Sequence, residues 1–165
     1  MTKILSLLIL LVSMNSYSQD SSKTYISFNT NIISNAGPID ENVSSAIEFG
    51  EQWKVFSLGI VTGQISKDFY NELRPNLNVF QQDKFVNTFT PGIGYIYNSN
   101  EPILIEFTTG IEYSWSDYYH ININFGQYYF SGKNSSSSSV FFGASIVRFF
   151  KPFKSSGLII SKNNN

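Results

Sequence analysis

The chain has 165 residues and lacks cysteine altogether. It can therefore form no disulfide, thiolate metal site or nucleophilic thiol, and it has no cysteine for a lipid anchor. Charge is also scarce, and the 11 basic and 12 acidic residues nearly cancel, which excludes the strong positive field of a nucleic-acid-binding protein. Aromatic residues are abundant, with 15 Phe, 10 Tyr and 2 Trp. The length is that of a single domain.

Long hydrophobic runs are missing as well, except at the N-terminus. There Lys3 precedes an apolar run over 4–12, and the small residues Ser16 and Ser18 flank Tyr17. A membrane helix needs about 20 apolar residues, so this pattern indicates an export signal over 1–18, cleaved near Ser18. We expect a folded domain over 19–150 and a disordered tail over 151–165, where the regular pattern of the domain is lost.

That pattern is clearest in "ILIEFTTGIEYSW", residues 103–115. Apolar residues such as Ile105, Phe107 and Ile111 alternate with polar or small ones such as Glu106 and Thr108. A period of two residues predicts a β-strand with two unlike faces.

Similar alternation predicts eight strands and no helix after the signal. The expected ranges are 24–34, 44–51, 54–66, 69–80, 85–97, 103–115, 119–130 and 139–150. The short connections require antiparallel neighbours, so the predicted fold is all-β: an eight-stranded antiparallel up-and-down barrel. Pro75 and Pro91 each remove a ladder donor and could mark bulges. The serine-rich stretch 132–139 is expected to be a flexible loop.

Three features indicate which face of the barrel is inside. The polar face is rich in Gly, Ser, Thr and Asn but poor in Lys, which suits a narrow lumen better than a solvated surface. Strands of 12 or 13 residues, when tilted, are long enough to cross a membrane. Aromatic residues with polar tips cluster at strand ends, as in an interfacial girdle. They are Trp53, Tyr95, Tyr97, Tyr113, Trp115, Tyr119 and Tyr129. We therefore predict a transmembrane barrel whose apolar face meets lipid.

In these features the chain resembles the family of small OmpA-like and OmpX-like outer-membrane barrels of Gram-negative bacteria. The resemblance covers 24–150 and includes the last strand, "VFFGASIVRFF", which is similar to their aromatic-ended insertion signal. It implies an outer-membrane monomer surrounded by lipid and inserted by the barrel assembly machinery. With Phe149 as the signal aromatic, Phe141 and Val147 would face lipid and Arg148 the lumen. The 15-residue tail departs from these barrels, which commonly end at that aromatic.

An even number of strands after an export signal places both ends of the barrel in the periplasm. The connections 35–43, 67–68, 98–101 and 131–138 would then be external, while 52–53, 81–84 and 116–118 would be periplasmic turns.

The predicted lumen holds two groups of charged residues. Glu72, Arg74 and Glu106 are expected in its outer half, and Glu48, Glu112 and Arg148 near its periplasmic end. A buried charge must be paired, so we interpret both groups as braces that fill a narrow barrel. The alternative is a gated ion path or a small-ligand site.

The residues offer no catalytic constellation. Some eight-stranded barrels are lipid-modifying enzymes with a histidine, an acid and a serine at the external rim, but His120, the only histidine, follows a predicted periplasmic turn. Ser116 and Asp117 beside it are ordinary turn residues. No spacing indicates a metal or cofactor site. The sequence predicts a small, plugged, non-catalytic outer-membrane barrel with a structural or surface-interaction role. The alternatives are an exported lipocalin-like barrel that binds ligands in solution and a narrow outer-membrane transport channel.

Overall fold

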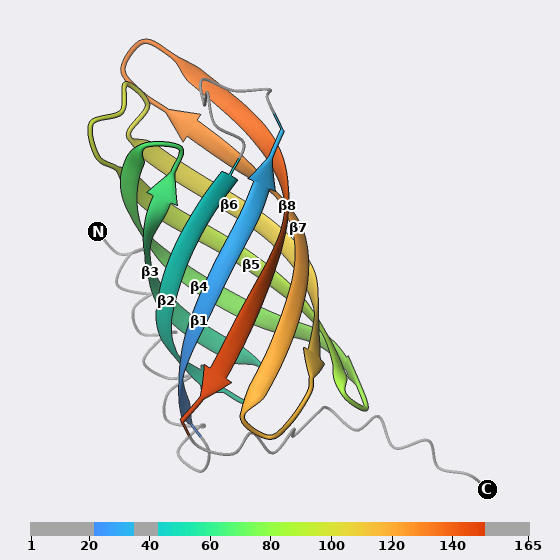
Figure 1. Ribbon diagram of the computed structural model, residues 1–165. Helices are drawn as coiled ribbons and strands as arrows, with labels where there is room; N and C mark the ends of the chain where they lie inside the picture. Colours follow the sequence, from blue (N-terminus) through green and yellow to red (C-terminus); the bar gives the residue numbers. More distant parts are fainter. Residues whose placement is uncertain (1–21, 35–42, 151–165) are drawn as a thin grey trace, which may run out of the picture.

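The computed structural model describes residues 22–34 and 43–150, which form one closed barrel (Figure 1). Its strands are β1 (Lys23–Ile33), β2 (Val43–Trp53), β3 (Phe56–Ile65), β4 (Asp68–Gln82), β5 (Phe85–Ile96), β6 (Ile103–Ser114), β7 (Tyr119–Ser131) and β8 (Ser136–Phe149). The predictions for 1–18, 35–42 and 151–165 fall outside the described residues and stay predictions.

Each strand pairs antiparallel with its neighbours in sequence, and β8 returns to pair with β1. The predicted eight-stranded antiparallel up-and-down barrel is therefore confirmed. Closure leaves no strand edge to be covered. Helices long and apolar enough to cross a membrane do not occur in the described part of the chain. We call the end where β1 begins and β8 ends the terminal end, and the opposite end the distal end.

The two faces of the barrel wall differ as the alternation predicts. In β6, Phe107 and Ile111 are exposed on the outside, whereas Leu104, Glu106 and Thr108 are buried inside. The same division runs through β1 to β7, so the outside is largely apolar and the inside largely polar. This arrangement is the reverse of that in a water-soluble barrel.

The two strand prolines lie at one interruption of the ladder between β4 and β5. Pairing runs as far as Leu73↔Ile93 and resumes at Leu77↔Phe89 in the same register, which places Pro75 opposite Pro91. The backbone N–H groups that the two prolines lack are therefore missing at the same interruption of the β4–β5 ladder. The β-bulge falls elsewhere, between Asn78 and Phe80 near the terminal end, so neither proline marks it.

The predicted orientation of β8 is wrong. Phe141, Val147 and Phe149 point into the barrel and are buried, whereas Arg148 is exposed on the outside with Phe142 and Ile146. Both faces of this strand carry large apolar residues, so its own pattern does not determine which face is inside.

Pairing with the neighbouring strands determines it instead. Residues directly opposite each other in an antiparallel pair project to the same face of the sheet. Phe149 lies opposite the inward Tyr25 of β1, and Val147 opposite the inward His120 of β7. β8 also begins earlier than predicted, because Ser136 to Ser139 pair with the end of β7 and are not part of a loop.

The orientation of β8 can be tested with single cysteines, since the chain has none of its own. Ala144 points outward and Ser145 is buried inside, and both are small enough to accept a cysteine. In the folded protein in detergent, a membrane-permeant maleimide should modify Ala144→Cys rapidly and Ser145→Cys slowly. After unfolding in urea the two variants should react equally. The opposite order in the folded state would restore the orientation expected from sequence.

Candidate functional site

The barrel interior is divided along its axis into layers, and an apolar layer fills the distal half. This distal plug takes at least one residue from each of the eight strands. Its members are Ile33, Ala46, Val61, Ile65, Tyr70, Ile96, Leu104, Tyr128, Phe130 and Phe141. The rings of Tyr128 and Phe141 stack with their centroids 4.2 Å apart, and Asn31 Nδ2 donates to the Tyr128 hydroxyl at 2.7 Å.

The plug borders an ionic network centred on Arg74. The guanidinium donates from Nη1 to Glu48 Oε2 at 3.2 Å, and from Nη2 to Glu72 Oε2 at 2.9 Å and to Glu106 Oε2 at 2.7 Å. All four side chains are at most 9% exposed. The remaining oxygens of two of the carboxylates are also engaged, because Tyr25 donates to Glu48 Oε1 at 2.6 Å and Thr108 donates to Glu106 Oε1.

Strand register brings these four residues together. Val61 of β3 lies opposite both Glu48 of β2 and Glu72 of β4. Gly59 lies opposite Arg74, and Gly92 opposite Glu106. Three carboxylates from β2, β4 and β6 therefore surround one guanidinium from β4.

Two of these glycines make room for the carboxylates. A Cβ atom at Gly59 would lie 2.2 Å from Glu48 Oε1, and one at Gly92 would lie 1.7 Å from Glu72 Oε1. Gly50 makes room in the same way for the ring of Tyr25, which a Cβ there would approach to 2.4 Å. The bore thus accommodates large polar side chains because the strands facing them have no side chain at those points.

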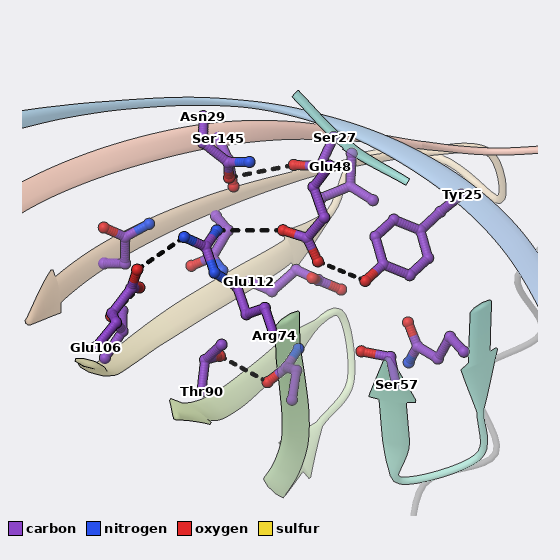
Figure 2. Close-up of a pocket in the computed structure, with 16 residues that line it drawn as sticks. Tyr25, Ser27, Asn29, Glu48, Ser57, Arg74, Thr90, Glu106, Glu112 and Ser145 are labelled. Carbon is purple, nitrogen blue, oxygen red and sulfur yellow. Dashed lines mark hydrogen bonds and ion pairs between the residues drawn. The ribbon is translucent and has the colours of Figure 1, made fainter. Parts of the chain in front are cut away.

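A small cavity lies beside the network and extends toward the terminal end (Figure 2). It has a volume of about 50 Å³, and its lining includes Glu106, Glu112, Asn122, Asn124 and Ser145. A polar cavity of this size can hold a few water molecules. It is too small for a sugar or a nucleotide.

The terminal end of the lumen is narrowed by packed rings. Phe149 packs against Tyr25 at a centroid distance of 5.8 Å and against His120 at 4.8 Å. His120 is fully buried, and its Nδ1 lies 2.6 Å from Glu112 Oε1. A carboxylate bonded to one ring nitrogen fixes the orientation of an imidazole.

The two predicted charge groups are therefore rearranged. Glu72, Arg74 and Glu106 do lie together, but Glu48 joins them and does not form a second group. Glu112 pairs with His120. Arg148 is outside the barrel, where its guanidinium carbon lies 5.8 Å from the ring centroids of both Tyr119 and Phe150. The predicted cluster of Glu48, Glu112 and Arg148 does not exist, because β8 presents its other face to the lumen.

The seven aromatic residues predicted as a girdle lie at the two ends of the barrel wall. Trp53, Tyr113, Trp115 and Tyr119 are at the terminal end, and Tyr95, Tyr97 and Tyr129 are near the distal end. All seven are exposed or half-buried on the outside. Tyr95 and Tyr97 make an edge contact at 5.5 Å, and Trp53 stacks on Phe56 at 5.7 Å.

Sequence reasoning missed two residues of the interior. Tyr25 was not singled out, although it alternates with Ile26 and so falls on the polar face of β1 with Ser27. His120 was set aside because it follows a predicted periplasmic turn, away from the external rim, yet β6 pairs with β7 so that Ser114 lies opposite it and Glu112 is near. Alternation could have located Tyr25, whereas the partner of His120 follows only from register.

The chemistry open to this interior is charge pairing and hydration. In residues 22–34 and 43–150 there is no group of three His, Cys, Asp or Glu residues placed to hold a metal ion. The buried His120–Glu112 pair joins β7 to β6 beside the ring of Phe149.

Neither a protein-family model nor a curated protein matches the chain. Solved structures do. The de novo designed barrel TMB2.3, determined by solution NMR, superposes with a TM-score of 0.55 at 16% identity, covering 81% of this chain and 99% of the design. A structure from work on de novo design of transmembrane β-barrels gives 0.52 at 15%, covering 79% and 98%. Neisserial surface protein A gives 0.44 at 10%, covering 77% and 94%. The two designs show that the fold is that of a transmembrane β-barrel.

Two arginine substitutions test the network. Arg74→Ala leaves three buried carboxylates without their cation, so the free energy of unfolding should fall by about 3–5 kcal/mol. Arg148→Ala removes only exposed contacts with two rings and should cost about 1 kcal/mol or less. Urea unfolding in detergent, followed by tryptophan fluorescence, measures both. Equal decreases in the free energy of unfolding would mean that Arg74 is no more important to stability than an exposed arginine.

Proposed function

We propose that the protein is a small β-barrel of the bacterial outer membrane. The observation that carries the proposal is the division of residues between the faces of its wall. Large apolar residues from every strand are exposed on the outside, among them Phe28 at 55%, Ile60 at 66% and Phe125 at 56%. A soluble monomer rarely exposes apolar patches larger than a few hundred Å². Lipid is the solvent that suits such a surface.

The aromatic residues at the two ends of the wall support the same proposal. Tyr and Trp prefer the boundary between hydrocarbon and water, because their rings are apolar and their tips form hydrogen bonds. The seven residues form two groups, one at the terminal end and one near the distal end, which matches the two boundaries of a bilayer. An exported lipocalin-like barrel would instead place its charged residues on this surface.

We propose from the predicted export signal that the terminal end lies in the periplasm and the distal end outside the cell. We propose that the barrel assembly machinery inserts the chain and that β8 presents the insertion signal. The outward aromatic next to the end of β8 is Phe150, which directly follows the strand and is 56% exposed, and not the buried Phe149. Surrounding lipid and this machinery are the partners we propose, for a protein that functions as a monomer.

The position of Phe107 tests membrane insertion. It is 47% exposed near the middle of β6, so Phe107→Arg would place a cation in the hydrocarbon core and should cost about 2–4 kcal/mol. Phe107→Leu is the matched control and should insert normally. The protein is diluted from urea into lipid vesicles. Its folded fraction is then measured by SDS gel electrophoresis of unheated samples, which separates the folded from the unfolded chain. Normal folding of Phe107→Arg without vesicles or detergent would favour the soluble barrel.

For the function of the inserted barrel we propose a non-catalytic structural or surface-interaction role with a closed lumen. The distal plug fills the bore with apolar side chains from all eight strands, and the Arg74 network closes it further along. Separating Arg74 from its carboxylates would cost several kcal/mol. The polar cavity favours a narrow channel instead, because it would form the inner half of a water-filled path.

Conductance distinguishes these two functions. In a planar bilayer the wild-type protein should show no steady open state of porin size, since eight strands leave a bore that side chains fill. Arg74→Ala should lower the stability of the barrel rather than open a pore. Steady single-channel currents from the wild-type protein would overturn the closed-lumen proposal and favour transport.

A further inference from the structure

A second hollow opens at the distal end, on the far side of the plug from the interior cavity. It lies among the described distal connections β3–β4, β5–β6 and β7–β8, which are grouped at the top of Figure 1. Its volume is about 540 Å³, which is within the range of small-molecule sites and about ten times that of the interior cavity. Its floor is part of the plug, formed by Ile65, Ile96 and Phe130.

The walls of the hollow are lined by groups that form hydrogen bonds. They belong to lining residues with carboxylate, amide, ammonium or hydroxyl side chains: Asp68, Glu101, Asn98, Asn100, Lys67, Ser66, Ser99 and Ser135. Carboxylates and amides are planar and have two polar atoms each, so one such group can bridge neighbouring hydroxyls of a ligand. The floor offers carbon surface for the C–H face of a ring.

Glu101 is the most telling member of this set. It is only 6% exposed although it lies in a connection between strands, and its Oε2 accepts a hydrogen bond from Ser137 of β8. Its backbone N–H donates to Ser99 Oγ at 3.1 Å. A buried carboxylate is costly unless it is hydrogen-bonded, and Ser137 supplies that bond here. No part of the Arg74 network includes it.

The connections around the hollow are also held in defined conformations. Asn98 and Ser66 have positive φ angles of 62° and 56°, the left-handed conformation of tight turns. Gly132 packs closely against the β5–β6 connection, since a Cβ there would lie 2.1 Å from the Asn100 carbonyl oxygen. The polar groups therefore surround a preformed space.

We propose that the distal hollow binds a short, uncharged saccharide. The charged groups in its lining, Lys67 against Asp68 and Glu101, give no excess positive charge to hold an anion. A purely apolar ligand would cover the Asp68 carboxylate and the Asn98 and Asn100 amides without offering them a hydrogen bond. A ligand with vicinal hydroxyls above an apolar ring face satisfies both the walls and the floor. The inference rests on the proposed function only for the side of the membrane that the hollow faces.

The experiment uses the refolded, isotope-labelled full chain in micelles, titrated with maltose, lactose or N,N′-diacetylchitobiose. We expect at least one of them to shift the backbone amide signals of Asn98 to Glu101 and Ser135 saturably, with millimolar affinity. Asn98→Gly removes an amide side chain but keeps the backbone freedom, and Asp68→Ala removes a carboxylate. Each should weaken binding by about tenfold. Asp117→Ala, at the terminal end, is the control and should leave binding unchanged.

A charge-neutral variant distinguishes binding of a saccharide from binding of a cation. Glu101→Gln keeps a planar hydrogen-bonding group, so saccharide binding should be largely retained, whereas binding of the diamine putrescine would be lost. Saturable shifts with putrescine alone would overturn the proposal. Shifts with none of the three saccharides would also overturn it, as would an equal effect of Asp117→Ala. Vesicle insertion is measured separately, so failure to bind sugar in a chain that inserts normally contradicts this inference and not the proposed function.

Discussion

Closure of the barrel by β1 and β8 is the constraint on which the rest of the structure depends. Until these two strands pair, each has an open edge, and β8 can present either of its apolar faces to the interior. Pairing Tyr25 with Phe149 and Ser27 with Val147 fixes that choice. It places Phe149 against Tyr25 and His120, and it leaves Arg148 outside. A shift of one residue would reverse every side chain of β8.

The narrow bore imposes a second condition, because inward side chains from opposite walls meet. Several large groups fit where another strand has a glycine, as with Glu72 against Gly92 and Glu48 against Gly59. The same positions bring three carboxylates within reach of one guanidinium. The network is therefore a consequence of packing in a closed tube as much as of charge attraction. Replacing a buried ion pair by well-packed apolar residues is often neutral or stabilising, so the network by itself is weak evidence of net stability.

The layers of the lumen separate two environments with different chemistry. On the terminal side of the plug, the small polar cavity and the His120–Glu112 pair suit bound water. On the distal side, the larger hollow presents amides and carboxylates to the surroundings. The barrel wall faces lipid in our proposal. A non-catalytic role in surface interaction would then depend on the distal connections, while the wall and lumen hold them in place.

The alternation of residues determined by itself that the chain forms eight antiparallel strands with an apolar outside, because strand periodicity is local and each strand carries its own pattern. It also identified the charged residues of β2, β4 and β6 as inward. Alternation could not predict the partners of those residues. The contacts of Glu48 with Arg74 and of His120 with Glu112 depend on how far each strand is displaced along its neighbour. β8, with large apolar residues on both faces, had no preferred orientation of its own. Only pairing with β1 and β7 decided it, since hydrogen bonding to two strands of known orientation leaves the third no alternative.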